Sequence, residues 1–152
     1  MEKEKNMLKG IPKILSPELL MVLNEMGHSD RIMIGDGNFP AESMGADSIV
    51  IRCDGHGVPE LLDAILQVFP LDTYVEHPVN LMEVMPGDNV ETPIWDTYKD
   101  IVKKYDDRGE KAFGYIERFK FYEETRKCYA LVATGESALY ANVMLQKGVV
   151  VD

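Results

Sequence analysis

Short apolar runs alternate with amphipathic segments along most of the chain. Strand-forming residues fill the runs 31–34, 48–53, 79–85, 115–119, 129–133 and 143–145. Apolar residues at helical spacing follow three starts that contain proline, namely Ser16-Pro17-Glu18, Val58-Pro59-Glu60 and Thr92-Pro93. Strands that alternate with helices predict a sheet with helices on both faces, which is a three-layer α/β/α sandwich of the α/β class.

The predicted helix ends indicate where the loops begin. The first helix has Leu19, Val22, Leu23 and Met26 on one face, and we expect Gly27 to end it in the left-handed conformation. The helix after Thr92 has Trp95, Tyr98, Val102 and Tyr105 on one face, and the polar turn 106–109 ends it. A charged helical piece through residues 123–127 is expected after the strand 115–119.

Size and composition are those of one ordinary globular domain. The chain has 152 residues, of which 45% are hydrophobic and 28% are charged. No repeat or linker divides it, so we expect a charged N-terminal extension over 1–7 and a single domain over 8–152. The 26 acidic and 16 basic residues give a formal charge of −10, which argues against a nucleic-acid partner.

Cysteine content and hydropathy favour a cytoplasmic protein. Cys53 and Cys128 stand far apart without a CxxC pattern, which predicts neither a disulfide framework nor a thiolate zinc site. Residues 1–9 do not resemble an export signal, and no apolar run is long enough to span a membrane. We therefore expect a reducing cytoplasm and no membrane association.

Three histidines are candidates for acid–base chemistry. His28 follows a predicted helix, and Asp36 follows the strand that begins at residue 31. A histidine and a carboxylate on neighbouring loops could exchange protons near neutral pH, although spacing alone favours a surface histidine that caps a helix end. His56 and His77 are expected to be turn residues, and the absence of a Cys/His cluster or HExxH predicts no metal.

The remaining candidates are hydrogen-bonding groups at predicted strand ends and turns. They are Asp36, Asn38, Arg118, Tyr122, Tyr140 and Asn142. Donors and acceptors in this mixture suit a neutral polyhydroxylated ligand such as a sugar. No GxSxG nucleophile motif occurs, and Glu136 is expected to stabilise a turn or an interface rather than to act in catalysis.

Several motifs occur in the same order as in a known family. They are Met26-Gly27-His28-Ser29-Asp30, Gly35-Asp36-Gly37-Asn38-Phe39-Pro40, Arg52-Cys53-Asp54-Gly55, Arg118-Phe119 with Phe121-Tyr122-Glu123, and Thr134-Gly135-Glu136 with Tyr140-Ala141-Asn142. From about residue 8 to residue 149 the chain resembles the RbsD/FucU family, which contains D-ribose pyranases and L-fucose mutarotases. Within it the chain is most similar to the fucose branch, although Asn38 stands where some bacterial members have histidine.

The resemblance implies a fold, an assembly and an activity. It implies a three-layer α/β/α subunit, ring-like homo-oligomers that are often decamers, and active sites near subunit contacts. It also implies interconversion of sugar anomers without a cofactor, with L-fucose as the expected substrate. D-ribose pyranase activity and non-catalytic monosaccharide binding are the alternatives, and the scarcity of lysine and arginine near the proposed site disfavours a phosphorylated sugar.

The resemblance also implies roles for individual residues. His28 matches the catalytic histidine, and Asp36 matches the substrate-binding carboxylate. The expected sugar contacts are Arg118, Tyr122, Tyr140 and Asn142, with Asp72 as an addition. In the resulting hypothesis, protonated His28 donates to the ring oxygen while Asp36 orients His28 or binds sugar hydroxyls, and Tyr140 and Asn142 hold the pyranose.

Overall fold

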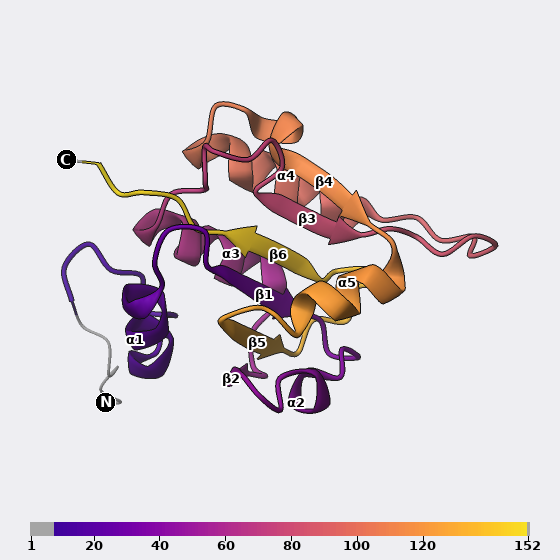
Figure 1. The fold of residues 1–152 in the computed structure, drawn as a ribbon, viewed down its shortest axis with the longest axis horizontal. Helices are drawn as coiled ribbons and strands as arrows, with labels where there is room; N and C mark the ends of the chain where they lie inside the picture. Colours follow the sequence, from indigo (N-terminus) through magenta and orange to yellow (C-terminus); the bar gives the residue numbers. More distant parts are fainter. Residues whose placement is uncertain (1–7, 152) are drawn as a thin grey trace.

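A mixed six-stranded sheet forms the centre of the computed structural model, which describes residues 8–151 (Figure 1). The strands are β1 (Arg31–Gly35), β2 (Ile49–Cys53), β3 (Val79–Met82), β4 (Phe113–Ile116), β5 (Ala130–Thr134) and β6 (Val143–Gln146). Their order is β2-β5-β1-β6-β3-β4. The pairs β2–β5, β1–β5 and β3–β4 are parallel, whereas β6 runs antiparallel to both β1 and β3.

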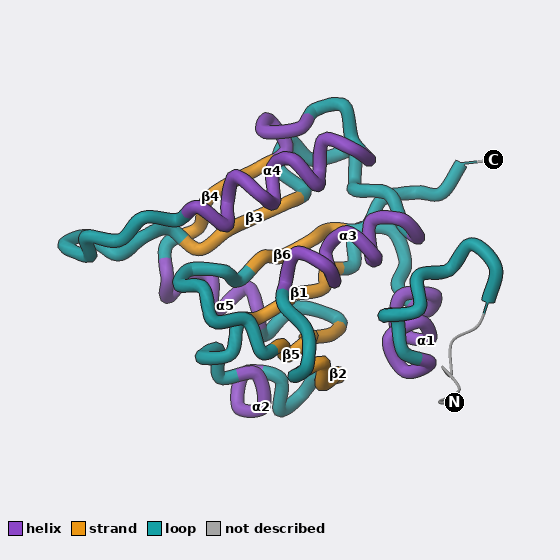
Figure 2. The backbone as a smooth tube through the Cα atoms, turned by 180° about the vertical axis from the view of Figure 1, so that it is seen from behind, coloured by secondary structure: helices purple, strands orange, loops and turns teal. Residues whose placement is uncertain are grey.

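Helices cover both faces of this sheet. They are α1 (Pro17–Glu25), α2 (Ala41–Met44), α3 (Val58–Val68), α4 (Pro93–Tyr105), the 3-10 helix η1 (Gly109–Ala112) and α5 (Arg118–Thr125). Figures 1 and 2 show α3 and α4 on one face and α5 on the other. The predicted three-layer α/β/α arrangement is therefore confirmed.

Side-chain alternation along each strand builds two apolar cores. Ile32 and Ile34 of β1 belong to the larger core, which also contains the buried residues of α1, α3 and α4. Met33 points to the other face and packs in the smaller core with Phe121 of α5 and Met144 of β6. Because β6 lies between β1 and β3, the sheet is continuous and both cores extend along it.

Several predicted boundaries are wrong for local reasons. Arg118 and Phe119 belong to α5 rather than to a strand, because the Glu117 carboxylate accepts hydrogen bonds from the Phe119 and Lys120 N–H groups and so starts the helix early. Gly27 does not take the left-handed conformation that we expected after α1. Ser29 has the positive φ, 74°, and its N–H donates to the Lys147 carbonyl.

Two short helices, α2 and η1, have no counterpart in the sequence-based prediction, and β3 ends at Met82 rather than at residue 85. Residues 83–92 instead form a loop that extends beyond the ends of β3 and β4 (Figures 1 and 2). The predicted extension over residues 1–7 lies outside the described residues. No helix within 8–151 combines the length and apolarity that a membrane crossing requires.

Candidate functional site

A pocket of about 280 Å³ opens at the end of the sheet where β1 finishes and β6 begins. Four regions of the chain, from loops, strand β3 and helix α5, contribute to it. Its lining residues are Asp36, Asn38, Phe39, Met82, Arg118, Tyr122, Leu139, Tyr140 and Asn142. The structure thus brings together all six hydrogen-bonding residues that were singled out at strand ends and turns.

Asp36 lines this pocket and comes directly after β1. It is 7% exposed, its N–H donates to Asn142 Oδ1 at 2.8 Å, and its Oδ1 accepts from the Asn38 N–H at 3.0 Å. Burial raises the pKa of the Asp36 carboxyl, and the nearby Glu136 charge adds to that rise, while backbone N–H groups partly offset it. Asp36 is therefore a carboxyl whose proton affinity is increased inside a polar cavity.

Arg118 and Tyr122 form the cationic wall of the pocket, one helical turn apart on α5. Arg118 Nε donates to Tyr122 Oη at 3.2 Å, and the guanidinium lies 5.5 Å from the centre of the Tyr122 ring. Arg118 is the one cation among the described residues that line the pocket. Its remaining N–H donors can face hydroxyl groups of a ligand.

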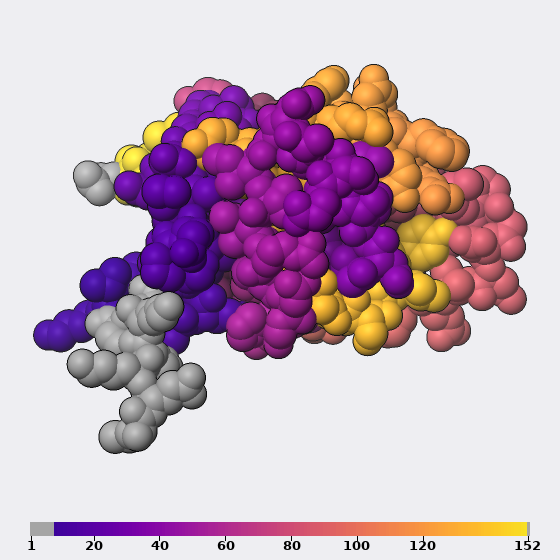
Figure 3. All heavy atoms as spheres, turned by 90° about the horizontal axis from the view of Figure 1, so that it is seen from below, coloured from indigo at the N-terminus to yellow at the C-terminus, as the bar shows by residue number. Residues whose placement is uncertain are grey.

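Hydrogen bonds fix both the backbone carbonyl and the side-chain hydroxyl of Tyr140. Its backbone has φ +55°, which is uncommon for a residue with a side chain, and its carbonyl accepts from Trp95 Nε1 at 2.7 Å. Its hydroxyl donates to the Asp88 carboxylate and accepts from the Met85 N–H at 3.1 Å. Figure 3 shows the segment before β6 between the α5 region and the loop 83–92.

The helix α4 supports this segment from beneath. Trp95 binds the Tyr140 carbonyl, and the hydroxyl of Tyr98 donates to the Ala141 carbonyl at 2.6 Å. Helical spacing predicts that these two aromatic residues lie on one face of a helix, but it does not indicate that both donate hydrogen bonds to the segment that lines the pocket. The sequence pattern likewise gives no indication of Asp88 or Met82. Their neighbours in sequence carry no signal for a site, because the contacts are long-range.

His28 lies outside this pocket, in a second polar cluster. Its Nε2 is 3.0 Å from Asp72 Oδ1, and its ring contacts Tyr74 edge-on with a centroid distance of 4.8 Å. Asp72 also accepts from Gln146 Nε2 at 2.9 Å and from the Tyr74 N–H at 2.9 Å. The His28 side chain is 38% exposed, whereas that of Asp72 is 2% exposed.

Within one chain this cluster and the pocket lie at opposite ends of β1. His28 precedes the strand and Asp36 follows it, so the five-residue strand separates them by roughly 15 Å at about 3.3 Å per residue. The register agrees, because Gln146 pairs with Arg31 whereas Val143, next to Asn142, pairs with Ile34. The expected pairing of His28 with Asp36 is thus not formed in one chain, and His28 pairs with Asp72 instead.

The carboxylate of Asp72 has an electrostatic environment suited to a cation. Burial alone would raise the pKa of Asp72, but hydrogen bonds from the Tyr74 N–H, the Gln146 amide and His28 outweigh that effect and lower it. Asp72 therefore stays ionised and can stabilise a protonated imidazole. This pair has the composition of an acid–base dyad with its histidine partly accessible.

The other candidates have local partners. His56 Nδ1 is 3.0 Å from Glu60 Oε1, and His77 lies beside Glu76 and the Lys111 carbonyl. Glu136 accepts from the N–H groups of Val58 and Ala138, which supports the expected structural role of that carboxylate. Within 8–151 no group of three His, Cys, Asp or Glu side chains could hold a metal ion.

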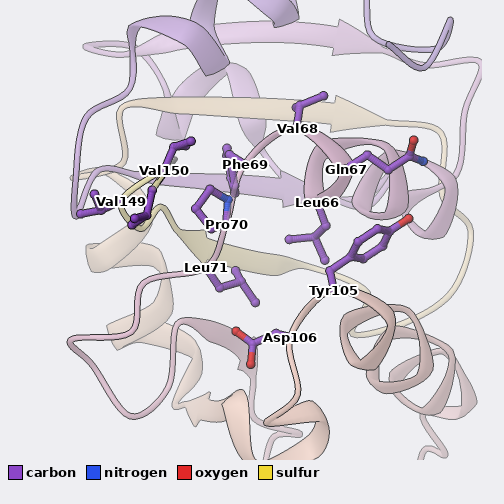
Figure 4. Close-up of a pocket in the computed structure, with 11 residues that line it drawn as sticks. Leu66, Gln67, Val68, Phe69, Pro70, Leu71, Tyr105, Asp106, Val149 and Val150 are labelled. Atoms are coloured by element: carbon purple, nitrogen blue, oxygen red, sulfur yellow. The ribbon is translucent and has the colours of Figure 1, made fainter. Parts of the chain in front are cut away.

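A second hollow, of about 390 Å³, lies near the other end of β6 (Figure 4). It is formed by the end of α3, the residues after it, the end of α4 and the C-terminal residues 149–151. Its lining is largely aliphatic, and its Asp106 carboxylate is paired with Arg108 at 2.8 Å. It therefore offers no convergent set of free polar side chains, unlike the pocket at Asp36.

Known proteins resemble this chain in sequence and in fold. Residues 9–150 match the RbsD / FucU transport protein family. The chain is 49% identical to a human protein named fucose mutarotase, over 93% of this chain and 94% of that protein. FucU from Bifidobacterium longum has a TM-score of 0.93 and 62% identity, covering 94% of this chain and all of its own.

A third comparison concerns a structure with a bound sugar. It is the fucose mutarotase of Streptococcus pneumoniae in complex with L-fucose, which is 48% identical with a TM-score of 0.89. The match covers 95% of this chain and all of that one.

Proposed function

The chain belongs to the RbsD/FucU family, and from that premise we propose that it interconverts the α and β anomers of L-fucose. The observation that carries the proposal is the pocket in which Asp36, Arg118, Tyr140 and Asn142 converge. Mutarotation requires a proton to leave the anomeric hydroxyl and another to reach the ring oxygen, so it needs positioned donors and acceptors. The fucose mutarotases among the relatives support the same activity.

The lining of the pocket favours a neutral 6-deoxy sugar. Its polar side chains provide both donors and acceptors for hydroxyl groups. Phe39, Met82 and Leu139 add apolar surface that suits the methyl group of fucose, which ribose lacks. A lining that contains a single arginine and a buried carboxyl suits a phosphorylated sugar poorly, because the Asp36 carboxyl would disfavour a phosphate group in the same pocket.

The acid in this proposal is His28 supplied by a second copy of the chain. The separation of His28 from the pocket along β1 supports this arrangement, as does the partial exposure of its side chain next to Tyr74, which is 80% exposed. The Asp72 carboxylate contacts Nε2 and leaves Nδ1 to face the sugar. The proposal therefore includes a homo-oligomer, consistent with the ring-like assemblies that the family resemblance implies.

Ring opening then proceeds with two proton transfers. Protonated His28 gives its proton to the ring oxygen, and the bond from the anomeric carbon to that oxygen breaks. The anomeric hydroxyl loses its proton to a basic group that lines the pocket as the aldehyde forms. The Asp72 carboxylate stabilises His28 while it is charged. Rotation of the aldehyde and the reverse transfers close the ring on the other face and restore both groups.

Saturation-transfer NMR on the anomeric protons of L-fucose tests this function directly. A catalytic amount of protein should accelerate exchange for L-fucose more than for D-ribose, and His28→Ala should abolish the acceleration while fucose binding persists. Binding without accelerated exchange would move the protein to the sugar-binding class. Faster exchange for D-ribose than for L-fucose would indicate a ribose pyranase.

We extend the proposal to a cytoplasmic location, which the two unpaired cysteines support.

A further inference from the structure

The hydroxyl of Tyr140 has two partners on the loop 83–92. It donates its only proton to Asp88 Oδ2 and accepts a hydrogen bond from the Met85 N–H. A tyrosine hydroxyl has one proton and two acceptor lone pairs, so one lone pair is left. Toward a ligand in the pocket, Tyr140 can therefore only accept, and the ligand must present a hydroxyl that donates.

We propose that Asp88 is the proton acceptor behind Tyr140, receiving through its hydroxyl the proton of the anomeric hydroxyl. The inference rests on the proposed mutarotase function and assigns the base that this function leaves open. As the ring opens, the anomeric O–H bond breaks and its proton forms a bond to Tyr140 Oη. The proton already on Tyr140 Oη moves to Asp88 Oδ2, so the phenol stays neutral.

The transfers balance over a complete turnover. During opening Asp88 gains one proton and protonated His28 loses one to the ring oxygen. During closure the ring hydroxyl returns a proton to His28, while Asp88 gives its proton back to Tyr140 and Tyr140 gives one to the anomeric oxygen. No oxidant, metal or further reactant is needed, and Asp88 acts as a positioning residue because it touches Tyr140 rather than the sugar.

The local backbone holds Asp88 in this position. The Asp88 N–H donates to the Met85 carbonyl at 3.0 Å, and Gly87 between them has φ +92°, a conformation that residues with a side chain rarely adopt. The same turn thus presents the Met85 N–H and the Asp88 carboxylate to one hydroxyl. The hydrogen bond to Asp88 raises the pKa of Tyr140, so the phenol remains protonated at neutral pH.

Arg118 supplies a positive charge near the Tyr140–Asp88 pair. The hydrogen bond with Tyr122 is the main cause that raises the pKa of the Arg118 guanidinium, and smaller electrostatic interactions with Tyr140 and Asp88 add to that rise. This fixed positive charge stabilises the partial charges that arise while the two protons move. Asp88 itself is exposed, so it can re-equilibrate with solvent between turnovers.

The alternative is that Asp88 only fastens the loop, and Asp88→Asn distinguishes the two roles. Asparagine can still accept a hydrogen bond from Tyr140, so the fastening persists, but it cannot accept the proton. We expect kcat for L-fucose exchange to fall about 100-fold, the size typical of a general base, with KM changed by less than about twofold. Glu91→Gln removes an exposed carboxylate from the same loop and should leave kcat unchanged.

A double substitution completes the test. If Asp88 acts through Tyr140, Asp88→Asn should cause no further loss of kcat in a Tyr140→Phe background. Equal urea midpoints for wild type and Asp88→Asn would exclude misfolding as the cause. Wild-type kcat in Asp88→Asn, or independent losses in the double variant, would overturn the role of Asp88 while leaving the mutarotase function intact. Absence of exchange in the wild-type protein would overturn both.

Discussion

Tyr98→Phe should reveal how much of the pocket depends on one buried hydroxyl. The Tyr98 side chain is fully buried on α4, and its hydroxyl donates to the Ala141 carbonyl at 2.6 Å. Phenylalanine keeps the ring and its packing but removes that donor, leaving the buried carbonyl without it. We expect a loss of about 2 kcal/mol in the free energy of unfolding, the usual cost of an unsatisfied buried polar group.

The same change at Tyr105 is a matched control. Tyr105 lies on the same helix, but it is 40% exposed and its hydroxyl binds Asp63, which also has Lys104 as a partner. Water can replace that hydroxyl, so Tyr105→Phe should cost less than about 0.5 kcal/mol. For a chain of this length the Tyr98 variant should then melt about 4–8 °C below wild type.

Urea unfolding at a fixed protomer concentration measures both variants, and saturation-transfer NMR on L-fucose measures the consequence for function. Ala141 lies between Tyr140 and Asn142, so loosening it should slow anomer exchange in Tyr98→Phe and not in Tyr105→Phe. Equal unfolding free energies in the two variants would refute the argument that burial of the Tyr98 hydrogen bond matters.

Other changes test separate parts of the structure. Arg118→Lys should raise the KM for L-fucose about tenfold, because lysine lacks the planar fork of donors, and an unchanged KM would assign Arg118 to holding Tyr122 alone. Gly135→Ala should melt well below Gly55→Ala. A Cβ at Gly135 would lie 2.1 Å from the Asp54 carbonyl oxygen, whereas a Cβ at Gly55 would meet nothing within 4 Å. Equal melting temperatures of the two variants would contradict this argument. The pKa of Asp72 is lowered in the folded protein, so the stability that its charge contributes is present above the ordinary pKa of 3.8 and is lost as the pH falls through the folded pKa. The difference in unfolding free energy between wild type and Asp72→Asn should therefore shrink from about pH 7 to about pH 2. A difference that stays constant over this range would contradict a stabilising charge on Asp72.

The layers of the fold could be predicted because strand and helix periodicities differ. Alternation through Ile32, Met33 and Ile34 and the proline-marked helix starts are local signals. The start of α5 was misplaced because the aromatic residues of 115–119 favour a strand, whereas capping by Glu117 favours a helix from Arg118 onward. The Glu117 cap decides this competition, because strand preference depends on context and is weak enough for a local hydrogen-bonded cap to override it.

The candidate site was predictable in its parts but not in its arrangement. Asp36 and Asn142 follow and precede strands, and polar residues at such places often meet at one edge of a sheet. The sequence did hold a signal against pairing His28 with Asp36, because the two flank one extended strand. The partners Asp72 and Asp88 could not be assigned, since each reaches its site through contacts across more than 40 residues.

Subunit complementation, followed by saturation-transfer NMR on L-fucose, tests the central claim most directly. Alone, His28→Ala chains should show no accelerated exchange because they lack the acid, and Tyr140→Phe chains should keep only about 1% of wild-type exchange because they lack the group at the anomeric hydroxyl. Co-expressed in equal amounts, they should recover about one quarter of wild-type exchange, since random assembly gives that share of sites an intact histidine from one copy and an intact tyrosine from the next. Mixed assemblies no more active than either variant alone would contradict a site completed by two copies of this chain.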